Sequence, residues 1–321
     1  MSLHCEADSL DDLLHHVYSY ILSEGHSSTN TQGKSLEVIG ASLLLRQPLN
    51  RVSRSESRHR AVSPLAELCW YLSGSNHAAG IVPYLPDYQR FMEADGTIHG
   101  GYGPRLFGNG ADNQVHNAIS RLRKESSSRR VVIQILDKTD MLQTRYHDIP
   151  CTSTVQFLIR DEAVHAVVSM RSNDAWLGLV HDIFAFTMLQ EIVARDLGKA
   201  VGSYTHFAAS LHLYASALEP ARQFISEGLQ STMNPMDPMP DGSPWQGIAE
   251  LLRAEEQARN GRLADQIDLP AHQYWADLAR ILSAYNRKQA GSEDEADRLY
   301  SEVTLQPMAE LLNRKYTRGR H

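Results

Sequence analysis

The sequence predicts an α+β fold, in which strands and helices share one hydrophobic core. Three apolar runs of strand length stand close together at residues 131–136, 155–159 and 163–170. A strongly apolar segment of helical length, residues 182–197, follows them and stops at a glycine, which commonly ends a helix. From Pro220 onward the pattern is helical with charged faces. This order favours a sheet packed with helices, together with an extra helical segment at the C-terminus.

The flanking elements are predicted from capping residues and periodicity. Ser9 precedes Asp11 and Asp12, a combination typical of a helix start. Pro64 fits the first position of a second helix. The glycine-rich stretch 96–110 lacks the strand, glycine loop and helix order of a phosphate-binding loop, so we expect an active-site loop there. The expected elements are a helix from Ser9 to Gly25, a loop at 26–34, a strand at 35–45, a basic loop at 51–60, a helix from Ser63, the glycine-rich loop, a helix through Val115, Ile119 and Leu122, a strand at 201–211, a helix from His212 or shortly after it, and a loop at 233–244.

Composition limits the classes of function. The 321 residues carry a formal net charge of −7, which argues against a nucleic-acid polymer as partner but leaves room for a local basic pocket for one nucleotide. Cys5, Cys69 and Cys151 show neither metal-ligand spacing nor a paired framework, so we expect no metal site and a reducing, cytoplasmic setting. The polar N-terminus does not look like a secretory signal, and no apolar run is long enough to cross a membrane.

Candidate functional residues collect at the ends of the central strands. A lone cysteine such as Cys151 is most often a small buried hydrophobe, and Asp182 alone could be a first-turn carboxylate that the helix dipole favours. Three arginines change the interpretation, because they would stabilise a thiolate and also suit phosphate; they are Arg129, Arg130 and Arg171. The combination therefore predicts a nucleophilic cysteine that acts on an electrophile carrying a phosphate.

Glu67 lies inside the otherwise apolar face of the second expected helix. A buried glutamate is costly unless it is paired or functional. A glutamate that faces solvent would have no such meaning, and the pattern alone leaves both interpretations open.

Several motifs together resemble the active-site core of thymidylate synthase. They are, in chain order, Glu67-Leu68-Cys69-Trp70-Tyr71-Leu72-x-Gly74, Tyr102-Gly103, Ser128-Arg129-Arg130, Pro150-Cys151, Arg171-Ser172-x-Asp174-x-x-Leu177-Gly178 and His212-Leu213-Tyr214. The resemblance covers residues 10–218 in matching order. It implies a thymidylate synthase-like fold with a large mixed β-sheet packed with helices. It also implies a catalytic core at residues 1–218 and a helical extension at 219–321, packed on the same domain.

One position departs from the family pattern. Where thymidylate synthases carry Leu-Gly-Leu-Pro-Phe-Asn, this chain reads Leu177-Gly178-Leu179-Val180-His181-Asp182. An aspartate in place of that asparagine resembles the deoxycytidylate hydroxymethylase branch. Uracil presents an N3–H donor and an O4 acceptor, whereas cytosine presents an N3 acceptor and a 4-amino donor. A carboxyl can accept from the amino group and share a proton with N3, and a mismatched base would leave buried polar groups unpaired.

The resemblance also implies a mechanism. Cys151 adds to C6 of a pyrimidine nucleoside monophosphate, and C5 then attacks the one-carbon unit of 5,10-methylenetetrahydrofolate. Water finally adds to the exocyclic methylene with Glu67 ordering it, where a thymidylate synthase would deliver hydride. The implied roles are catalytic for Cys151, Glu67, Asp182 and Tyr102, substrate-binding for Arg129, Arg130, Arg171, Ser172, Asp174, His212 and Tyr214, and cofactor-binding for Asp174, Gly178 and Tyr88. Arg129 and Arg130 would come from the second subunit of a homodimer.

Three departures from the family pattern concern the phosphate, the cofactor wall and the C-terminus. The polar loop 26–34 holds Lys34 but no arginine for the phosphate, and the basic loop 51–60 is either its replacement or a solvated surface segment. Segment 84–91 has no tryptophan to wall the cofactor, so Tyr88 or Phe91 is the candidate substitute. The chain ends in a basic stretch, 314–321, instead of a short apolar closing tail, and the preceding helices are expected to cap the cofactor site.

The choice of substrate has several alternatives. We expect dCMP to be preferred over CMP, because Arg129, Arg130 and Ser172 are residue types found in family members that use deoxynucleotides. CMP and a thymidylate synthase reaction on dUMP are the alternatives. A catalytically silent relative that binds a nucleotide, or a protein partner through the C-terminal helices, is the alternative from another class. The joint presence of Cys151 and Glu67 argues against it, since a binding module needs no nucleophile.

Overall fold

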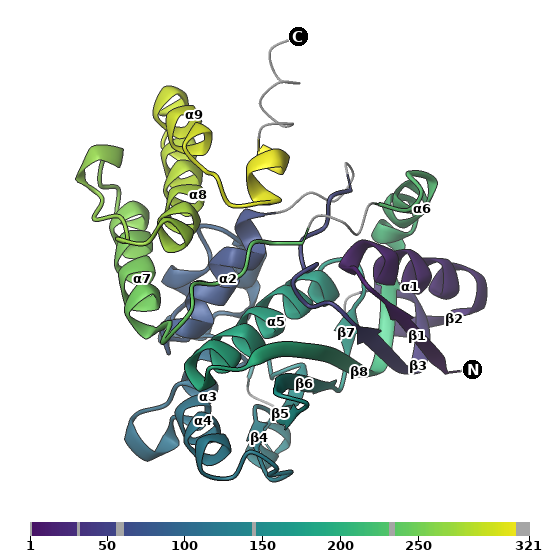
Figure 1. The fold of residues 1–321 in the computed structure, drawn as a ribbon. Coiled ribbons are helices and arrows are strands. Elements are labelled where there is room, and N and C mark those ends of the chain that lie inside the picture. The colour runs from purple at the N-terminus through teal and green to yellow at the C-terminus, as the bar shows by residue number, and fades with distance from the viewer. Residues whose placement is uncertain (1, 31–32, 56–60, 143–145, 231–234, 313–321) are drawn as a thin grey trace.

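The centre of the molecule is a mixed β-sheet. The computed structural model describes residues 2–30, 33–55, 61–142, 146–230 and 235–312. Within them an eight-stranded sheet runs in the order β1-β3-β8-β6-β5-β4, with β2 paired to β3 and β7 paired to β8 (Figure 1). The β1–β3, β6–β8 and β7–β8 pairs are parallel and the others antiparallel. The strands are β1 Leu3–Ala7, β2 His26–Asn30, β3 Gly33–Leu45, β4 Val132–Gln134, β5 Thr152–Arg160, β6 Ala163–Met170, β7 Asn173–Asp174 and β8 Ala200–Tyr214. The predicted α+β class with a large mixed sheet is confirmed.

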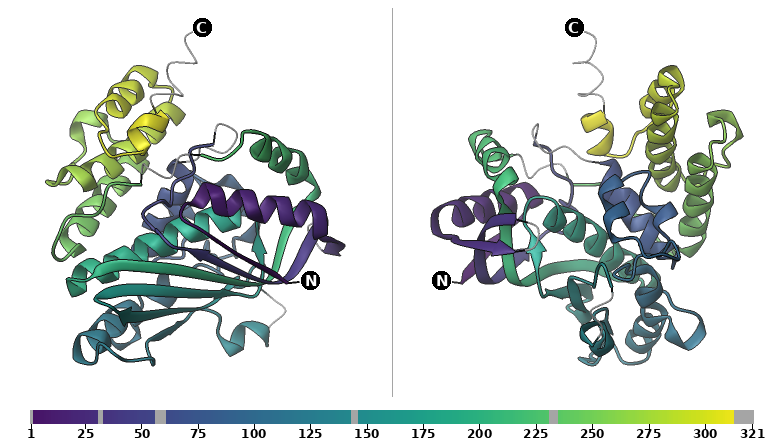
Figure 2. Two further views of the ribbon diagram at one scale, coloured as in Figure 1. Left: turned by 45° about the vertical axis from the view of Figure 1, so that its right-hand side comes forward. Right: turned by 180° about the vertical axis from the view of Figure 1, so that it is seen from behind.

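Helices cover one side of this sheet. The α-helices are α1 Leu10–Glu24, α2 Val62–Leu72, α3 Gly103–Leu106, α4 Gln114–Lys124, α5 Gly178–Leu197, α6 Leu218–Ser226, α7 Trp245–Arg259, α8 Gln273–Gln289 and α9 Glu293–Ser301. Figure 2 shows α1 and α5 lying over the same side of the sheet. Every residue of α5 from Leu179 to Ala194 is buried, because the sheet lies on one side of the helix and α2 on another. The helix ends at Gly198, whose φ of 63° is the left-handed conformation that glycine adopts without strain.

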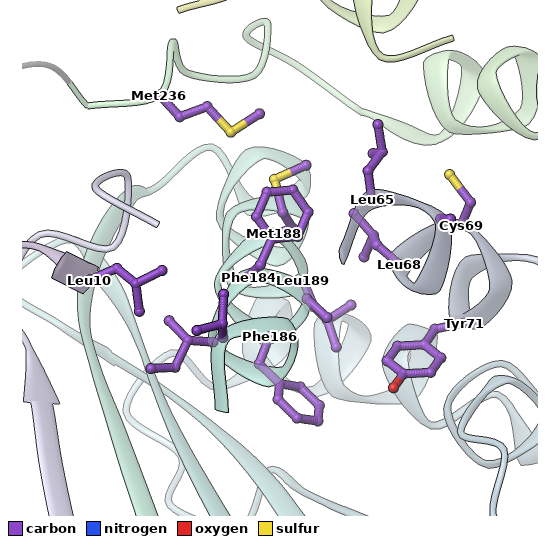
Figure 3. Close-up of a cluster of buried hydrophobic side chains, with 14 of the residues drawn as sticks. Leu10, Leu65, Leu68, Cys69, Tyr71, Phe184, Phe186, Met188, Leu189 and Met236 are labelled. Atoms are coloured by element: carbon purple, nitrogen blue, oxygen red, sulfur yellow. The ribbon is translucent and has the colours of Figure 1, made fainter. Parts of the chain in front are cut away.

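The packing of α2 on α5 closes the core above the sheet. Figure 3 shows Leu65, Leu68 and Tyr71 of α2 facing the α5 side chains Met188 and Leu189. All five are buried. This contact positions the two helices that carry Glu67 and Asp182, two polar residues of the site described below.

The predicted start of α1 is confirmed, but the loop predicted after it is wrong. Ser9 Oγ accepts a hydrogen bond from the backbone N–H of Asp12 at 3.2 Å, as an N-cap does. Residues 26–30 form β2, which pairs antiparallel with the start of β3. A strand at the edge of a sheet needs no apolar side chains on its open side, so the polar sequence concealed it.

Two helix boundaries also differ from the prediction. His212 does not begin a helix; it lies in β8, opposite Glu37 of β3 and Asp174 of β7. The chain turns into α6 only at Leu218, because pairing with strands on both sides extends β8. Helix α5 begins at Gly178, which places Asp182 beyond its first turn and removes the helix-dipole explanation for that residue. The expected loop at 96–110 contains the short helix α3.

The C-terminal part is helical, as predicted. Helices α7 and α8 pack against each other and against α2, and α9 packs on α8 (Figure 1). Tyr84, in the segment after α2, links this layer to the rest of the molecule. Its hydroxyl donates to Glu255 Oε1 of α7 at 2.8 Å and accepts from Asn286 Nδ2 of α8 at 2.7 Å. The boundary at residue 218 between a core and an extension remains a prediction.

Candidate active site

A cavity of about 630 Å³ lies between α2, the beginning of α5 and the ends of β6 and β8. It gathers all the sequence-predicted site residues except Arg129 and Arg130. The predicted residues that line it are Glu67, Tyr88, Tyr102, Cys151, Arg171, Ser172, Asp174, Gly178, Asp182, His212 and Tyr214.

Cys151 precedes β5 and is held close to Arg171. The Arg171 guanidinium donates to the carbonyls of Pro150 and Ile149 at 2.9 and 3.0 Å, and its Nη2 lies 3.6 Å from the Cys151 sulfur. Burial nevertheless raises the pKa of the Cys151 thiol to about 11; Arg171 opposes this, and Asp148 reinforces it. Of the three arginines predicted to stabilise the thiolate, Arg171 lies beside the sulfur and lowers the pKa of the thiol, but burial outweighs it. Attack by Cys151 requires a group that accepts its proton.

Glu67 is buried and fully paired, so the solvent-facing alternative is wrong. Tyr71, one turn along α2, donates to its Oε1 at 2.8 Å, and Tyr88 donates to the same oxygen. His181 Nδ1 lies 2.6 Å from the other oxygen, Oε2. Burial raises the pKa of Glu67, but the hydrogen bonds from His181, Tyr88 and Tyr71 outweigh it, so the pKa lies below its ordinary value. Glu67 is thus a carboxylate at neutral pH.

The pKa of Asp182 is shifted in the opposite direction. Burial raises it well above the ordinary value, and the charges of Glu67 and Asp174 raise it further. Its Oδ2 accepts a hydrogen bond from Asn173 Nδ2 at 2.7 Å, which opposes the shift without cancelling it. The pKa values of two carboxyl groups at one site are therefore shifted apart, lowered for Glu67 and raised for Asp182.

A buried chain of hydrogen bonds fixes the orientation of Asn173. Its Oδ1 lies 3.1 Å from His206 Nε2, and His206 Nδ1 lies 2.9 Å from the Tyr204 hydroxyl. Burial lowers the pKa of His206 to about 3, so its ring is neutral. Because Asn173 Nδ2 donates to Asp182, its Oδ1 must accept from Nε2–H, and Nδ1 then accepts from the tyrosine. Sequence reasoning missed Asn173 and His206, although Asn173 stands inside the Arg171–Asp174 motif.

The Tyr102 hydroxyl lies beside Thr152, the residue that follows Cys151. Its hydroxyl accepts from the backbone N–H of Thr152 at 3.1 Å and from the Thr152 hydroxyl at 3.0 Å. The ring packs on Tyr71, with centroids 4.9 Å apart. Burial and the charge of Asp182 raise the pKa of the phenol well above its ordinary value. Tyr102 is therefore a neutral hydroxyl placed beside Cys151.

Another part of the cavity lining carries polar side chains, two carboxylates among them. Ser172, Asp174, His212 and Tyr214 lie there as predicted. Three further lining residues were not found from the sequence: Ser28, Glu37 and Ser210. Glu37 and His212 are paired across β3 and β8, and Ser210 donates a hydrogen bond to Glu37. Such hydroxyl, imidazole and carboxylate groups suit the hydroxyls of a sugar.

Comparison with known proteins identifies the family. A family model described as thymidylate synthase matches residues 14–236. The chain belongs to the thymidylate synthase family. It is 28% identical over 199 residues to a deoxyuridylate hydroxymethyltransferase of Delftia phage PhiW-14, covering 58% of this chain and 54% of that protein. A deoxyuridylate hydroxymethyltransferase of Pseudomonas phage M6 is 28% identical over 189 residues, covering 58% and 53%. A thymidylate synthase of Symbiobacterium thermophilum is 29% identical over 192 residues, covering 54% and 64%. The chain thus spans between half and two thirds of these relatives.

The family's phosphate-binding arginines are only partly represented around the cavity. Arg129 and Arg130 are exposed and lie away from it. The basic loop does not supply a substitute at Arg51, which is buried in an ion pair with Glu191 at 2.6 Å, so that interpretation is wrong for this residue. Residues 56–60 and 314–321, which entered the predictions, lie outside the described part of the chain.

Aromatic side chains form one wall of the cavity. Trp70 of α2 and Tyr88 meet edge to face with centroids 5.6 Å apart, and Phe91 packs on Tyr88 at 6.0 Å. All three line the cavity, including Tyr88 and Phe91, the two candidates that the sequence offered for the cofactor wall. A planar pterin is compatible with such a wall, since aromatic rings stack on one another.

The described part of the chain contains neither a membrane-spanning helix nor a cluster of metal ligands. None of its helices is long and apolar enough to cross a membrane. Among the same residues, no group of three or more histidine, cysteine, aspartate or glutamate side chains is placed to hold a metal ion.

Proposed function

We propose that this member of the thymidylate synthase family transfers a one-carbon unit from 5,10-methylenetetrahydrofolate to C5 of dCMP, and that water completes the reaction to give 5-hydroxymethyl-dCMP. The observation that carries the proposal is Asp182, a buried carboxyl at the position of the family's base-recognising asparagine, in one cavity with Cys151 and Glu67. CMP is the alternative substrate if the sugar end admits a 2′-hydroxyl.

Asp182 suits cytosine through the polarity of its hydrogen bonds. As a neutral carboxyl it donates from its hydroxyl to N3 and accepts from the 4-amino group with its other oxygen. As a carboxylate it accepts from the amino group and from a proton on N3. In its ionised form it would face the O4 acceptor of uracil with a second acceptor, a mismatch that costs about 1–3 kcal/mol in a buried site.

The remaining residues divide the chemistry among them. The Cys151 thiol first gives its proton to a solvent water, Arg171 beside it stabilises the thiolate, and the thiolate sulfur then forms the bond to C6. The bound folate supplies the one-carbon unit for C5. Glu67, ionised and facing the same cavity, orients the water that adds at the C5 methylene and accepts its proton. Tyr88 and Trp70 wall the folate side and exclude bulk water.

A second copy of the chain would complete the phosphate site. Arg129 and Arg130 are exposed at the start of the chain segment that leads into β4, where another protomer can reach them. Val132 and Phe207, which point away from α5, are 48% and 41% exposed, and such apolar side chains on a sheet face favour association. In a homodimer, Arg129 and Arg130 of each protomer would reach the cavity of the other protomer. They would supply phosphate-binding arginines, which the loop 26–34 lacks.

A second candidate is hydroxymethylation of dUMP. Two relatives named deoxyuridylate hydroxymethyltransferase favour it. A neutral Asp182 also permits it, because a carboxyl with one donor and one acceptor can match uracil when its proton sits on the other oxygen.

A comparison of the turnover of three nucleotides tests the proposal. The protein is incubated with 5,10-methylenetetrahydrofolate and dCMP, CMP or dUMP, and the products are identified by mass and by release of tritium from C5. Hydroxymethyl-dCMP as the fastest product supports the proposal. Thymidylate from dUMP would refute the hydroxymethylase assignment, and hydroxymethyl-dUMP as the faster product would replace dCMP by dUMP. Cys151→Ser is the matched control, which should bind nucleotide without releasing tritium.

A further inference from the structure

A histidine joins α2 and α5 beside the cavity. His181, in the first turn of α5, lies between Ser63 and Glu67, which are one turn apart on α2. Its Nδ1 is 2.6 Å from Glu67 Oε2, and its Nε2 is 3.1 Å from Ser63 Oγ. The ring is 7% exposed and lines the cavity. Bonds at both ring nitrogens fix its position and its plane.

The groups around Glu67 come from three elements. Tyr71 faces it from α2, Tyr88 from the segment Pro86–Phe91, and His181 and Asp182 from α5. Both tyrosines donate to Oε1, whereas the histidine is the partner of Oε2. Asp182 is the neighbouring carboxyl, whose pKa is raised by burial and further by the charge of Glu67. Glu67 is therefore held as an anion by donors on both of its oxygens, against the effect of burial.

We propose that His181 is a positioning residue, which holds Glu67 as an oriented carboxylate for the water that adds at the C5 methylene, while Ser63 fixes the ring. This inference rests on the proposed function. With His181 on one side of Oε2 and the tyrosines on Oε1, the direction left for a water is set by these three partners. A carboxylate that rotated freely would orient that water poorly.

The step that His181 supports can be written in full. The water oxygen bonds to the methylene carbon, its proton passes to Glu67, and the electron pair of the exocyclic double bond moves into the pyrimidine ring. The Cys151 sulfur then leaves C6 as thiolate while the C5–C6 double bond forms again. His181 touches no reacting atom in this scheme; it acts through Glu67.

His181→Phe tests the inference, because it keeps a ring and removes both hydrogen bonds. Without the donor at Oε2, burial acts on Glu67 with less opposition, and the pKa of Glu67 should rise. The step needs ionised Glu67, so the acid limb of kcat should move to higher pH by the same amount. Ser63→Ala, which frees the ring at Nε2 only, should give a smaller shift in the same direction.

Controls separate this effect from a loss of packing. His116→Phe, at an exposed position of α4, should leave the acid limb in place. His181→Asn returns an amide donor near Oε2 and should recover part of the shift. If His181→Phe slows turnover equally at all pH values and leaves the acid limb unchanged, the positioning role is wrong and His181 merely packs.

A readout without turnover keeps the inference distinct from the proposed function. Carbon-13 NMR of carboxyl-labelled glutamate, with the Glu67 signal assigned through Glu67→Gln, follows the titration of Glu67 directly. A raised Glu67 pKa in His181→Phe supports the inference whichever nucleotide proves to be the substrate, and an unchanged one refutes it. Absence of hydroxymethylated product from the wild type refutes the proposed function alone.

Discussion

Asp182→Asn is the substitution that most directly examines base recognition. In the wild type, Asn173 Nδ2 donates to Asp182 Oδ2 at 2.7 Å, and the bond from His206 keeps Asn173 from turning over. An asparagine at position 182 must therefore place its carbonyl oxygen toward Asn173. Its amide nitrogen then occupies the other position as a fixed donor, in the order that uracil needs. We expect cytosine nucleotides to bind more weakly and dUMP to bind better.

The size of the change follows from burial. Asp182 is 8% exposed, so a polar group of the base left without a partner cannot recover a hydrogen bond from bulk water. Each such group costs about 1–3 kcal/mol, which corresponds to roughly a fivefold to 150-fold change in kcat/KM. The kcat/KM should fall for dCMP and rise for dUMP, and both changes lower the ratio of the dCMP value to the dUMP value.

Competition between dCMP and dUMP in one reaction measures that ratio directly. Asn173→Ala is the informative companion, because it removes the group that fixes the orientation and should weaken discrimination without reversing it. A wild type that already prefers dUMP, or a ratio that Asp182→Asn leaves unchanged, would refute the assignment of Asp182 to cytosine.

Three further expectations concern the nucleophile, the sugar and stability. Cys151→Ser should abolish tritium release from C5 while dCMP binding, followed by calorimetry, survives through the other polar groups of the cavity; retained turnover would exclude covalent catalysis. The kcat/KM for dCMP should exceed that for CMP by roughly tenfold to hundredfold, since a buried 2′-hydroxyl without a partner costs about 1–3 kcal/mol, and a higher value for CMP would refute this reading of the sugar end. The pKa of Asp182 is raised well above its ordinary value by burial in the folded protein but not in the unfolded chain, so wild-type stability should fall as pH rises from about 4 toward the raised pKa. Over that range thermal melting should show Asp182→Asn gaining on the wild type, and a constant difference would mean that Asp182 is already ionised in the fold.

The sequence predicted the elements whose signals are local. The strands around Cys151 and the helix ending at Gly198 follow from apolar runs and one glycine, and these features recur in the structure at nearly the same residues. The polar edge strand β2 has no such signal, because its pairing with β3 depends on backbone groups. For His212, the local pattern predicted that the strand ends at residue 211. Backbone pairing of His212 with β3 and β7 instead keeps it in β8.

The candidate site was predictable as a set of residues but not as a set of contacts. Glu67 and His181 are 114 positions apart, and their hydrogen bond exists only because α2 packs on α5. The direction of the Arg171 side chain is likewise a tertiary result: two of its donors serve the carbonyls before Cys151. Burial therefore affects the pKa of the Cys151 thiol more than the charge of Arg171 does. The sequence pattern alone could not reveal this balance.

The hydroxyl of Tyr84 ties the cavity wall to the C-terminal helices. It stands four positions before Tyr88, which donates to Glu67, while its own partners are Glu255 of α7 and Asn286 of α8. Any free energy by which a ligand at Tyr88 tightens that docking must appear, equal in size, as a gain in ligand affinity when the docking is tightened from outside. We therefore expect substitutions at Glu255 or Asn286 to change the affinity of the cavity for its ligand, although neither residue lines the cavity.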